Sequence, residues 1–227
     1  MEQIKNETKR LSPLRIALTK GRLEKKAISL LEKMGYDCEN AINKGRKLIV
    51  RVKSLDGKSE LELVFAKAAD CLTYVDAGVC DMAIVGKDTI EEDEKSFYEI
   101  CDLGFGKCNF AVAAPKGKDP FEDGYKIKCI ATKYPHIAKR FFEEENIDVS
   151  IVKIEGSVEL APLLSLADAI VDIVETGTTL RENGLYVAKY IMEVSAKLIV
   201  NTASLKLRKN EIEDFAELAE KNKALVK

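Results

Sequence analysis

Short apolar runs alternate with segments of helical period along most of this chain. The run LRIAL (residues 14–18) has the length of a strand. The apolar positions that follow, 23, 27, 30, 31 and 34, share one face of a helix that Gly35 would end. DMAIVG (81–86) and DAIVDIV (168–174) each predict a further buried strand. Because strands and helices alternate in this way, we predict an α/β protein with a mostly parallel sheet.

Two stretches depart from simple alternation. KLIVRV (47–52) and LELVFA (61–66) flank the turn SLDGKS and predict a pair of neighbouring strands. Near the C-terminus, residues 189–205 predict one long extended segment. Asn210 and Glu213 have the spacing of an N-cap and its capping-box partner, so we expect the last helix over residues 213–225.

Composition narrows the classes of function. The chain has 227 residues, a net charge of -2 and a single histidine. A charge so close to zero argues against partners held by bulk charge, such as nucleic acid or an anionic membrane. The N-terminal sequence has no apolar core of a signal peptide, no run approaches the roughly 20 apolar residues of a membrane span, and the six cysteines are scattered. We therefore expect a cytoplasmic protein with no metal site of its own.

The most distinctive stretch is DIVETGTTLRENGL (172–185), in which an apolar strand ends in Thr-Gly-Thr-Thr. Ligands of α/β sheets bind beyond the carboxyl ends of strands. Glycine lets the backbone approach an anion, the threonine hydroxyls add neutral donors, and a helix starting near Leu180 would present its positive end. Asp172, four residues earlier, could accept hydrogen bonds from two sugar hydroxyls. The loop suggests a ribose-phosphate site, although a turn that merely caps a helix would show the same T-G-x-T pattern.

The pattern D-x-x-x-T-G-x-T-L resembles the phosphoribosyl diphosphate (PRPP) loop of phosphoribosyltransferases. More specifically, the chain resembles ATP phosphoribosyltransferase in its short form, the catalytic subunit for the first step of histidine biosynthesis. Four segments carry the likeness: RIALTKGRL (15–23), TYVDAGVCDMAIVGKD (73–88), EGSVELAP (155–162) and ADAIVDIVETGTTLRENGL (167–185). The chain departs from the family pattern at Thr19 and Leu72, where proline is usual, and at Lys67, where arginine is usual.

The resemblance implies a fold and an assembly. The fold would be two α/β lobes of the periplasmic-binding-protein type II, with the active site in the interlobe cleft. Lobe I would comprise residues 1–104 with 189–227, and lobe II residues 105–188 with the PRPP loop. The chain ends at Lys227, which leaves no room for the regulatory domain of the family's long form. The expected partner is therefore a histidyl-tRNA-synthetase-like regulatory subunit, around a homodimer within a hetero-oligomer.

The resemblance also implies a reaction. It joins N1 of the ATP adenine to C1 of PRPP and expels pyrophosphate, so ATP and PRPP are the expected substrates. Mg²⁺ would be carried on PRPP, held mainly by its phosphates. Adenine N1 has a lone pair and no hydrogen, so little proton transfer is needed there. Orientation and charge stabilisation would dominate the catalysis.

Site residues follow from the matched motifs. By resemblance, PRPP binding is assigned to Glu159, Asp172, Glu175, Thr176, Gly177, Thr178 and Thr179. Catalytic roles at the pyrophosphate or the ATP phosphates are assigned to Lys20, Arg22 and Arg46. Further contacts to ATP or pyrophosphate are assigned to Gly21, Arg51, Lys67 and Asp88. A solvated side chain is the alternative for Glu159, Lys20 and Arg22. Arg46, Arg51 and Asp88 could equally lie on the surface without a role.

Two other functions fit parts of the sequence. A non-catalytic binding module is one alternative, because the two-lobed fold also serves solute receptors. Another phosphoribosyltransferase, acting on a free base, is the second. That class usually places two acidic residues directly before its threonine loop, whereas Ile173 and Val174 follow Asp172 here.

Overall fold

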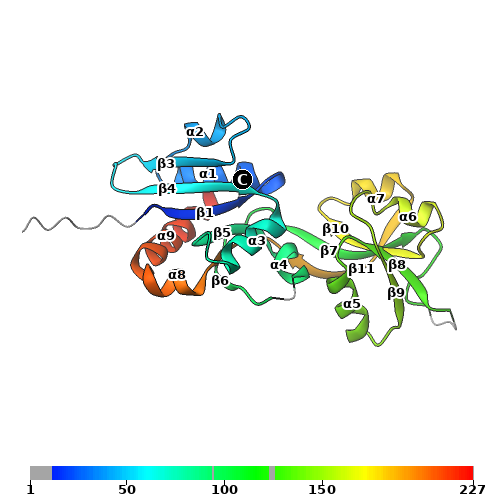
Figure 1. The fold of residues 1–227 in the computed structure, drawn as a ribbon. Coiled ribbons are helices and arrows are strands. Elements are labelled where there is room, and N and C mark those ends of the chain that lie inside the picture. The colour runs from blue at the N-terminus through cyan, green and yellow to red at the C-terminus, as the bar shows by residue number, and fades with distance from the viewer. Residues whose placement is uncertain (1–11, 94, 123–125, 227) are drawn as a thin grey trace, which may run out of the picture. The chain divides into compact units, whose positions relative to one another are not determined.

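The computed structural model describes residues 12–93, 95–122 and 126–226 (Figure 1). The N-terminal residues 1–11, which bear on the expected lack of a signal peptide, lie outside this description. The chain divides into two compact units, Met1–Ile84 with Val200–Val226, and Val85–Ile199. We call them the first and the second unit. The lobe limits expected from the family resemblance stay a prediction.

A seven-stranded sheet has the strand order β2-β3-β4-β1-β5-β12-β6. Its strands are β1 (Leu14–Thr19), β2 (Tyr36–Asp37), β3 (Ile49–Ser54), β4 (Glu60–Ala66), β5 (Met82–Gly86), β6 (Tyr98–Asp102) and β12 (Ala196–Val200). Strand β1 pairs in parallel with β4 and β5, and the predicted strand pair forms the antiparallel hairpin β3–β4. Both unit boundaries fall within strands of this sheet.

The first unit also contains helices, and all but the fourth of them bury apolar side chains. They are α1 (Arg22–Lys33), α2 (Glu39–Ile42), α3 (Ala68–Asp76), α8 (Thr202–Leu207) and α9 (Lys209–Asn222), followed by the 3₁₀ turn η1 (Lys223–Leu225). The predicted face of α1 is confirmed, because Leu23, Ala27 and Leu30 are among its buried residues. None of the described helices combines the length and apolar character that a membrane span requires.

A five-stranded sheet in the second unit has the order β11-β7-β10-β8-β9. Its strands are β7 (Cys108–Pro115), β8 (Lys128–Thr132), β9 (Val149–Lys153), β10 (Ala169–Val174) and β11 (Leu185–Val194), and the helices of this unit are α4 (Lys87–Glu92), α5 (Pro135–Glu144), α6 (Leu160–Leu163) and α7 (Thr178–Glu182). Strand β10 is parallel to β8 and antiparallel to β7. At the sheet edge, β11 carries two irregularities in its register with β7, between Val187 and Lys189 and between Tyr190 and Met192.

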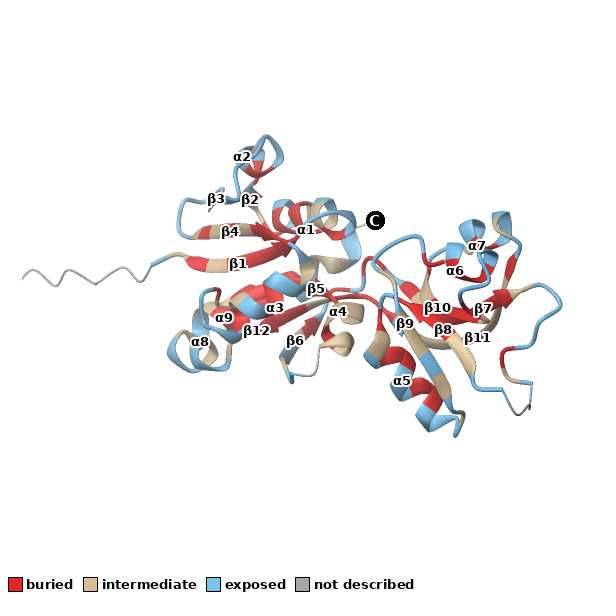
Figure 2. Cartoon of the chain, turned by 45° about the vertical axis from the view of Figure 1, so that its right-hand side comes forward, coloured by how far each residue is buried: buried red, intermediate tan, exposed pale blue. Residues whose placement is uncertain are grey.

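Apolar side chains fill both faces of the five-stranded sheet. Phe110 and Val112 of β7 belong to a core cluster with Phe142 of α5. Ala111 and Ala113, which point to the other face, belong to a second cluster with Leu180 of α7. Figure 2 shows buried residues along the strands of this unit. Because both faces are covered, a charged residue in β10 has to lie near the end of the strand or lose much of its contact with water.

Three expectations about secondary structure are wrong in whole or in part. In the described ladders both sheets are mixed rather than mostly parallel, because the β3–β4 hairpin and the return of β11 along β7 add antiparallel pairs. The predicted extended segment 189–205 ends earlier, because Asn201 accepts a hydrogen bond from Ser204 N at 2.9 Å and starts α8. Helix α9 begins at Lys209 without the predicted Asn210 cap, and Arg208 pairs with Glu211 at 2.6 Å instead.

Candidate active site

The threonine loop joins β10 to α7 in the second unit. Gly177 has a φ of 69°, a left-handed conformation that glycine adopts without strain. The hydroxyls of Thr176 and Thr178 lie 3.1 Å apart, and Thr178 N donates to Thr176 Oγ1 at 3.4 Å. Thr176, Thr178 and Thr179 are all exposed. The loop therefore offers hydroxyl donors to solvent, although α7 has only five residues and supplies no more than one helical turn behind them.

Asp172, on β10, is half-buried, and its Oδ1 accepts a hydrogen bond from Ile173 N at 2.8 Å. The pKa of Asp172 is raised to about 6: burial raises it most and the charge of Glu159 adds to this, while the hydrogen bond from Ile173 N and the charge of Lys133 lower it. Glu159 lies at the start of α6 and is also half-buried. The structure thus brings together the two carboxylates assigned to the ribose hydroxyls. Glu175, assigned to the same ligand, is exposed at the start of the threonine loop.

Tyr134 lies next to this acid pair and was not among the predicted site residues. It follows β8, and its hydroxyl donates a long hydrogen bond of 3.4 Å to Asp88 Oδ2. Its ring packs edge-on against Phe110, with 4.8 Å between centroids. Burial raises the pKa of Tyr134 above its usual range, and the charges of Asp88 and Asp172 add to this effect. Within the second unit, Tyr134 therefore lies near both Asp88 and Asp172.

Helix α4 is tied to α5 by its own carboxylates. Glu92 accepts hydrogen bonds from His136 N and Ile137 N, each at 3.1 Å, and so caps the first turn of α5. Glu91 pairs with Arg140 at 2.7 Å. Earlier in the chain, the Asp88 carboxylate lies so close to Gly86 that a Cβ there would collide with it. These contacts hold α4, and Asp88 with it, against α5 within the second unit.

Basic residues gather at the carboxyl ends of β1 and β4 in the first unit. Lys20 N donates to Ala66 O at 2.8 Å, which places Lys20 beside Lys67, the residue that precedes α3. Gly21 has a φ of 95° and begins α1. Arg46 lies in the loop before β3, two residues from Leu48, whose carbonyl accepts Phe65 N at 2.8 Å. Lys20, Arg46 and Lys67 are exposed, as is Arg22 at the start of α1. We call Lys20, Arg46 and Lys67 the basic edge.

Arg51 is the predicted cation that the structure does not bring to the basic edge. Its side chain pairs with Glu62 at 3.3 Å, and Arg15 pairs with the same carboxylate at 2.6 Å. Glu62 lies four residues before Ala66 on β4, roughly 13 Å along the strand at about 3.3 Å per residue. A contact between Arg51 and a ligand at the basic edge would therefore need the Glu62 pair to break.

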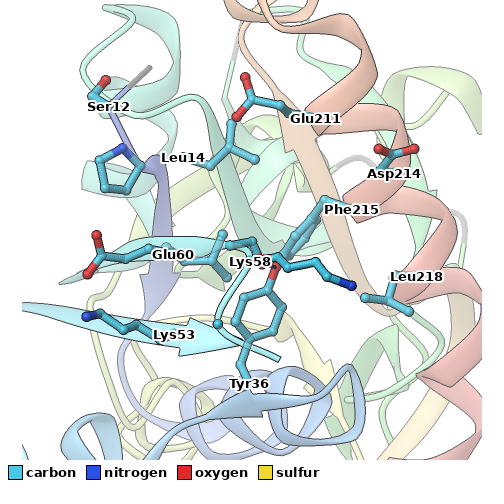
Figure 3. Close-up of a pocket in the computed structure, with 14 residues that line it drawn as sticks. Ser12, Leu14, Tyr36, Lys53, Lys58, Glu60, Glu211, Asp214, Phe215 and Leu218 are labelled. Atoms are coloured by element: carbon cyan, nitrogen blue, oxygen red, sulfur yellow. Dashed lines mark hydrogen bonds between the residues drawn. The ribbon is translucent and has the colours of Figure 1, made fainter. Parts of the chain in front are cut away.

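A cavity of about 860 Å³ lies in the first unit, at the opposite ends of β1 and β4 from the basic edge (Figure 3). Its lining includes Leu14, Tyr36 and Leu61 from the strands and Phe215 from α9, and it contains none of the predicted site residues. Separately, among the described residues no three His, Cys, Asp or Glu side chains are grouped so as to hold a metal ion. We call Glu159, Asp172 and the loop Thr176–Thr179 the acid–threonine site. The predicted chemistry therefore falls on the basic edge and the acid–threonine site, not on this cavity.

Comparison with known proteins identifies relatives along most of the chain. The family model for ATP phosphoribosyltransferase matches residues 67–221. An ATP phosphoribosyltransferase of Clostridium kluyveri is 56% identical over 200 residues, which cover 88% of this chain and 89% of that protein. One of Clostridium novyi is 53% identical over 207 residues, covering 91% and 96%.

Solved structures agree with this assignment. A chain of the ATP phosphoribosyl transferase (HisG:HisZ) complex from Thermotoga maritima superposes with a TM-score of 0.76 at 30% identity, covering 93% of this chain and 98% of that chain. The periplasmic aliphatic sulphonate binding protein SsuA from Escherichia coli has a TM-score of 0.61 at 11% identity, covering 95% and 74%. SsuA shares the fold alone, so the predicted periplasmic-binding-protein type II fold is confirmed while the non-catalytic alternative is not favoured. By sequence over most of its length, this chain belongs to the ATP phosphoribosyltransferases, the pentosyl-transferring enzymes of histidine biosynthesis.

Proposed function

We propose that the chain transfers the phosphoribosyl group of PRPP to N1 of the ATP adenine, and that the second unit binds PRPP. One observation carries the assignment of PRPP to this unit. Glu159 belongs to an earlier segment than Asp172 and the threonine loop, yet all of them lie within one unit. Glu159 is close enough to Asp172 to raise its pKa. A sugar with adjacent hydroxyls and a phosphate matches that set of acceptors and donors.

The acid pair would bind the ribose. Ionised carboxylates accept hydrogen bonds from adjacent hydroxyls, and such charge-assisted bonds are about twice as strong as neutral ones. Because the pKa of Asp172 is raised to about 6, its carboxylate is ionised at neutral pH but poorly solvated. Ribose hydroxyls would supply the donors that water cannot. Thr176, Thr178 and Thr179 would then donate to the 5-phosphate, with Glu175 at the margin of the same loop.

The basic edge would bind pyrophosphate or the ATP phosphates. Lys20, Arg46 and Lys67 are exposed, and Gly21 allows an anion to approach the backbone at the start of α1. Negative charge develops on the diphosphate as its bond to C1 breaks, so fixed cations lower the barrier. Arg22 belongs to the same proposal, whereas a role for Arg51 requires release of its pair with Glu62.

Catalysis would depend on the orientation of the two substrates and on stabilisation of the charge that develops on the leaving pyrophosphate. The adenine N1 lone pair attacks C1 while the C1–oxygen bond to pyrophosphate breaks, and no proton has to leave N1. Asp88 would contribute negative charge near the ribose rather than proton transfer, since Tyr134 already donates to it. Mg²⁺ would arrive bound to the phosphates of PRPP and neutralise part of the leaving group's charge.

The assembly belongs to the same proposal. A relative with 30% identity was solved in a HisG:HisZ complex. We infer that this chain likewise works with a regulatory subunit resembling histidyl-tRNA synthetase, as a homodimer within a hetero-oligomer in the cytoplasm.

A direct assay tests the proposal. The full chain would be incubated with ATP, PRPP and Mg²⁺, with pyrophosphatase present to draw the reaction forward, while absorbance follows the N1-substituted adenine. We expect product with ATP and none with free purines or pyrimidines, and more product when the regulatory subunit is added. Turnover of a free base instead would contradict the proposal.

A further inference from the structure

The side chain of Arg181, on α7, lies directly against the threonine loop. Its Nη1 donates to Thr176 O at 3.2 Å, and its Nη2 donates to Thr178 Oγ1 at 3.1 Å. A Cβ on Gly177 would lie 3.5 Å from Nη1, so the guanidinium packs against the loop backbone itself. Arg181 lies outside the D-x-x-x-T-G-x-T-L pattern, and neither its spacing nor its type marked it as a site residue.

The direction of these hydrogen bonds leaves the loop able to donate. A guanidinium has five N–H groups and no acceptor, so Thr178 Oγ1 must accept from Arg181. The Thr178 hydroxyl hydrogen can then be donated to Thr176 Oγ1, 3.1 Å away, or to a ligand. In the first case the hydrogen of Thr176 is left for the ligand. Arg181 itself keeps three N–H groups beyond its two bonds to the loop.

The other charges in the loop's own sequence are negative, and Lys133 of another segment lies near Asp172. Between residues 172 and 182 the chain has three carboxylates, Asp172, Glu175 and Glu182, and Arg181 as the single cation. A phosphate monoester brings a further charge of about -1.5 to -2 at neutral pH. Threonine hydroxyls are neutral, and one turn of helix adds little positive charge. Among the residues that the structure describes, Arg181 is not engaged in an ion pair, so its charge is available to an anion.

We propose that Arg181 is a further PRPP-binding residue, which holds the threonine hydroxyls as donors and supplies the positive charge for the 5-phosphate. The proposal rests on the proposed function of the loop. A guanidinium suits this task better than an ammonium group because it can bind the loop and a phosphate oxygen at the same time.

The test compares three variants of the full chain by calorimetric titration with PRPP and Mg²⁺ at several salt concentrations. Arg181→Gln removes the charge, Arg181→Lys keeps it without the fork, and Lys139→Gln removes one exposed charge of α5 as a control. We expect Arg181→Gln to weaken PRPP binding about tenfold or more and to reduce its dependence on salt. Arg181→Lys should recover part of the affinity, and Lys139→Gln should match the wild type.

The outcomes separate this proposal from the function of the loop. If the wild type fails to bind PRPP, the proposed function itself is wrong. If the wild type binds but Arg181→Gln has the same affinity and salt dependence, Arg181 does not contact the phosphate. If Arg181→Lys is as weak as Arg181→Gln at every salt concentration, the contribution is not one of charge, which also overturns the proposal. Thermal unfolding of each variant verifies that the fold is retained.

Discussion

The basic edge of the first unit and the acid–threonine site of the second unit, which we propose bind phosphates and ribose respectively, differ in how far their charged side chains are buried. Lys20 and Lys67 are exposed and are placed by the backbone at the ends of two parallel strands. Asp172 is half-buried in a strand whose neighbours exclude water, and its pKa is raised to about 6. An exposed cation leaves the stability of the fold almost untouched, whereas a buried carboxylate lowers it. A residue that destabilises its own strand is a better candidate for function than one that is merely charged.

Asp172→Asn should have the largest effect on catalysis. The substitution keeps the shape but loses the charge that strengthens bonds to the ribose hydroxyls. Two charge-assisted bonds at roughly 1.5 kcal/mol each predict a kcat/KM for PRPP lower by about 100-fold. Asp168→Asn is the matched control, because Asn can still accept the bond from Cys129 N. Equal losses in the two variants would mean that Asp172 acts through the strand and not through the ligand.

The same variant should be more stable than the wild type at neutral pH. The pKa of Asp172 is about 6 in the folded state against about 3.9 in an unfolded chain, so the fold loses stability as pH rises from about 4 to about 6, and the loss is complete above that. We expect Asp172→Asn to raise the free energy of unfolding by about 2 to 3 kcal/mol at pH 8, with the difference vanishing near pH 4. Urea unfolding at pH 4, 6 and 8 measures this. A variant no more stable at pH 8 would show that the carboxylate is well solvated.

Lys20→Gln should lower activity while leaving the stability of the fold almost unchanged. We expect kcat/KM to fall about tenfold because one cation near the leaving diphosphate is lost. The free energy of unfolding should change by less than about 0.5 kcal/mol, since the side chain is exposed. Steady-state kinetics and urea unfolding of the same preparation test both halves. Unchanged kinetics would remove Lys20 from the proposed site, and a large loss of stability would contradict its description as a residue placed by the backbone alone.

Glu92→Gln should have the smallest effect. We expect it to destabilise the start of α5 in the second unit rather than to weaken ligand binding. Loss of the charge at the first turn of α5 predicts a free energy of unfolding lower by about 1 kcal/mol at pH 7. Hydrogen exchange at the Ile137 amide should quicken with it. If exchange at Ile137 were unchanged, Glu92 would not be the cap that protects α5.

The alternation of elements, the buried face of α1 and the position of the threonine loop could be predicted from sequence, because each depends on residues near one another in the chain. Asp172 was predictable for the same reason, as a carboxylate in an otherwise apolar strand. The prediction of an extended segment over residues 189–205 was wrong at its end. Asn201 caps α8 through Ser204 N, and the apolar run before Asn201 led us to extend the strand past this cap.

Contacts between distant residues could not be predicted. Asp88 and Tyr134 are separated by 46 positions, and only the packing of α4 on α5 brings them together. Arg181 shows a different limit. It lies three residues from Thr178, but its sequence position does not reveal that the side chain folds back over the loop instead of extending into solvent. Side-chain direction on a short helix depends on its packing, which the pattern of residues does not encode.

Strand β11 is an edge strand of the five-stranded sheet and has ten residues, a length sufficient for pairing with another strand. Its two irregularities, between Val187 and Lys189 and between Tyr190 and Met192, interrupt the regular row of backbone donors and acceptors that such pairing needs. Lys189 Nζ also forms a salt bridge with Glu145 Oε2 of the same chain at 2.6 Å, which places an ion pair beside the irregular stretch. The edge of β11 is therefore poorly suited to pairing with a strand of another molecule, which disfavours aggregation through this strand.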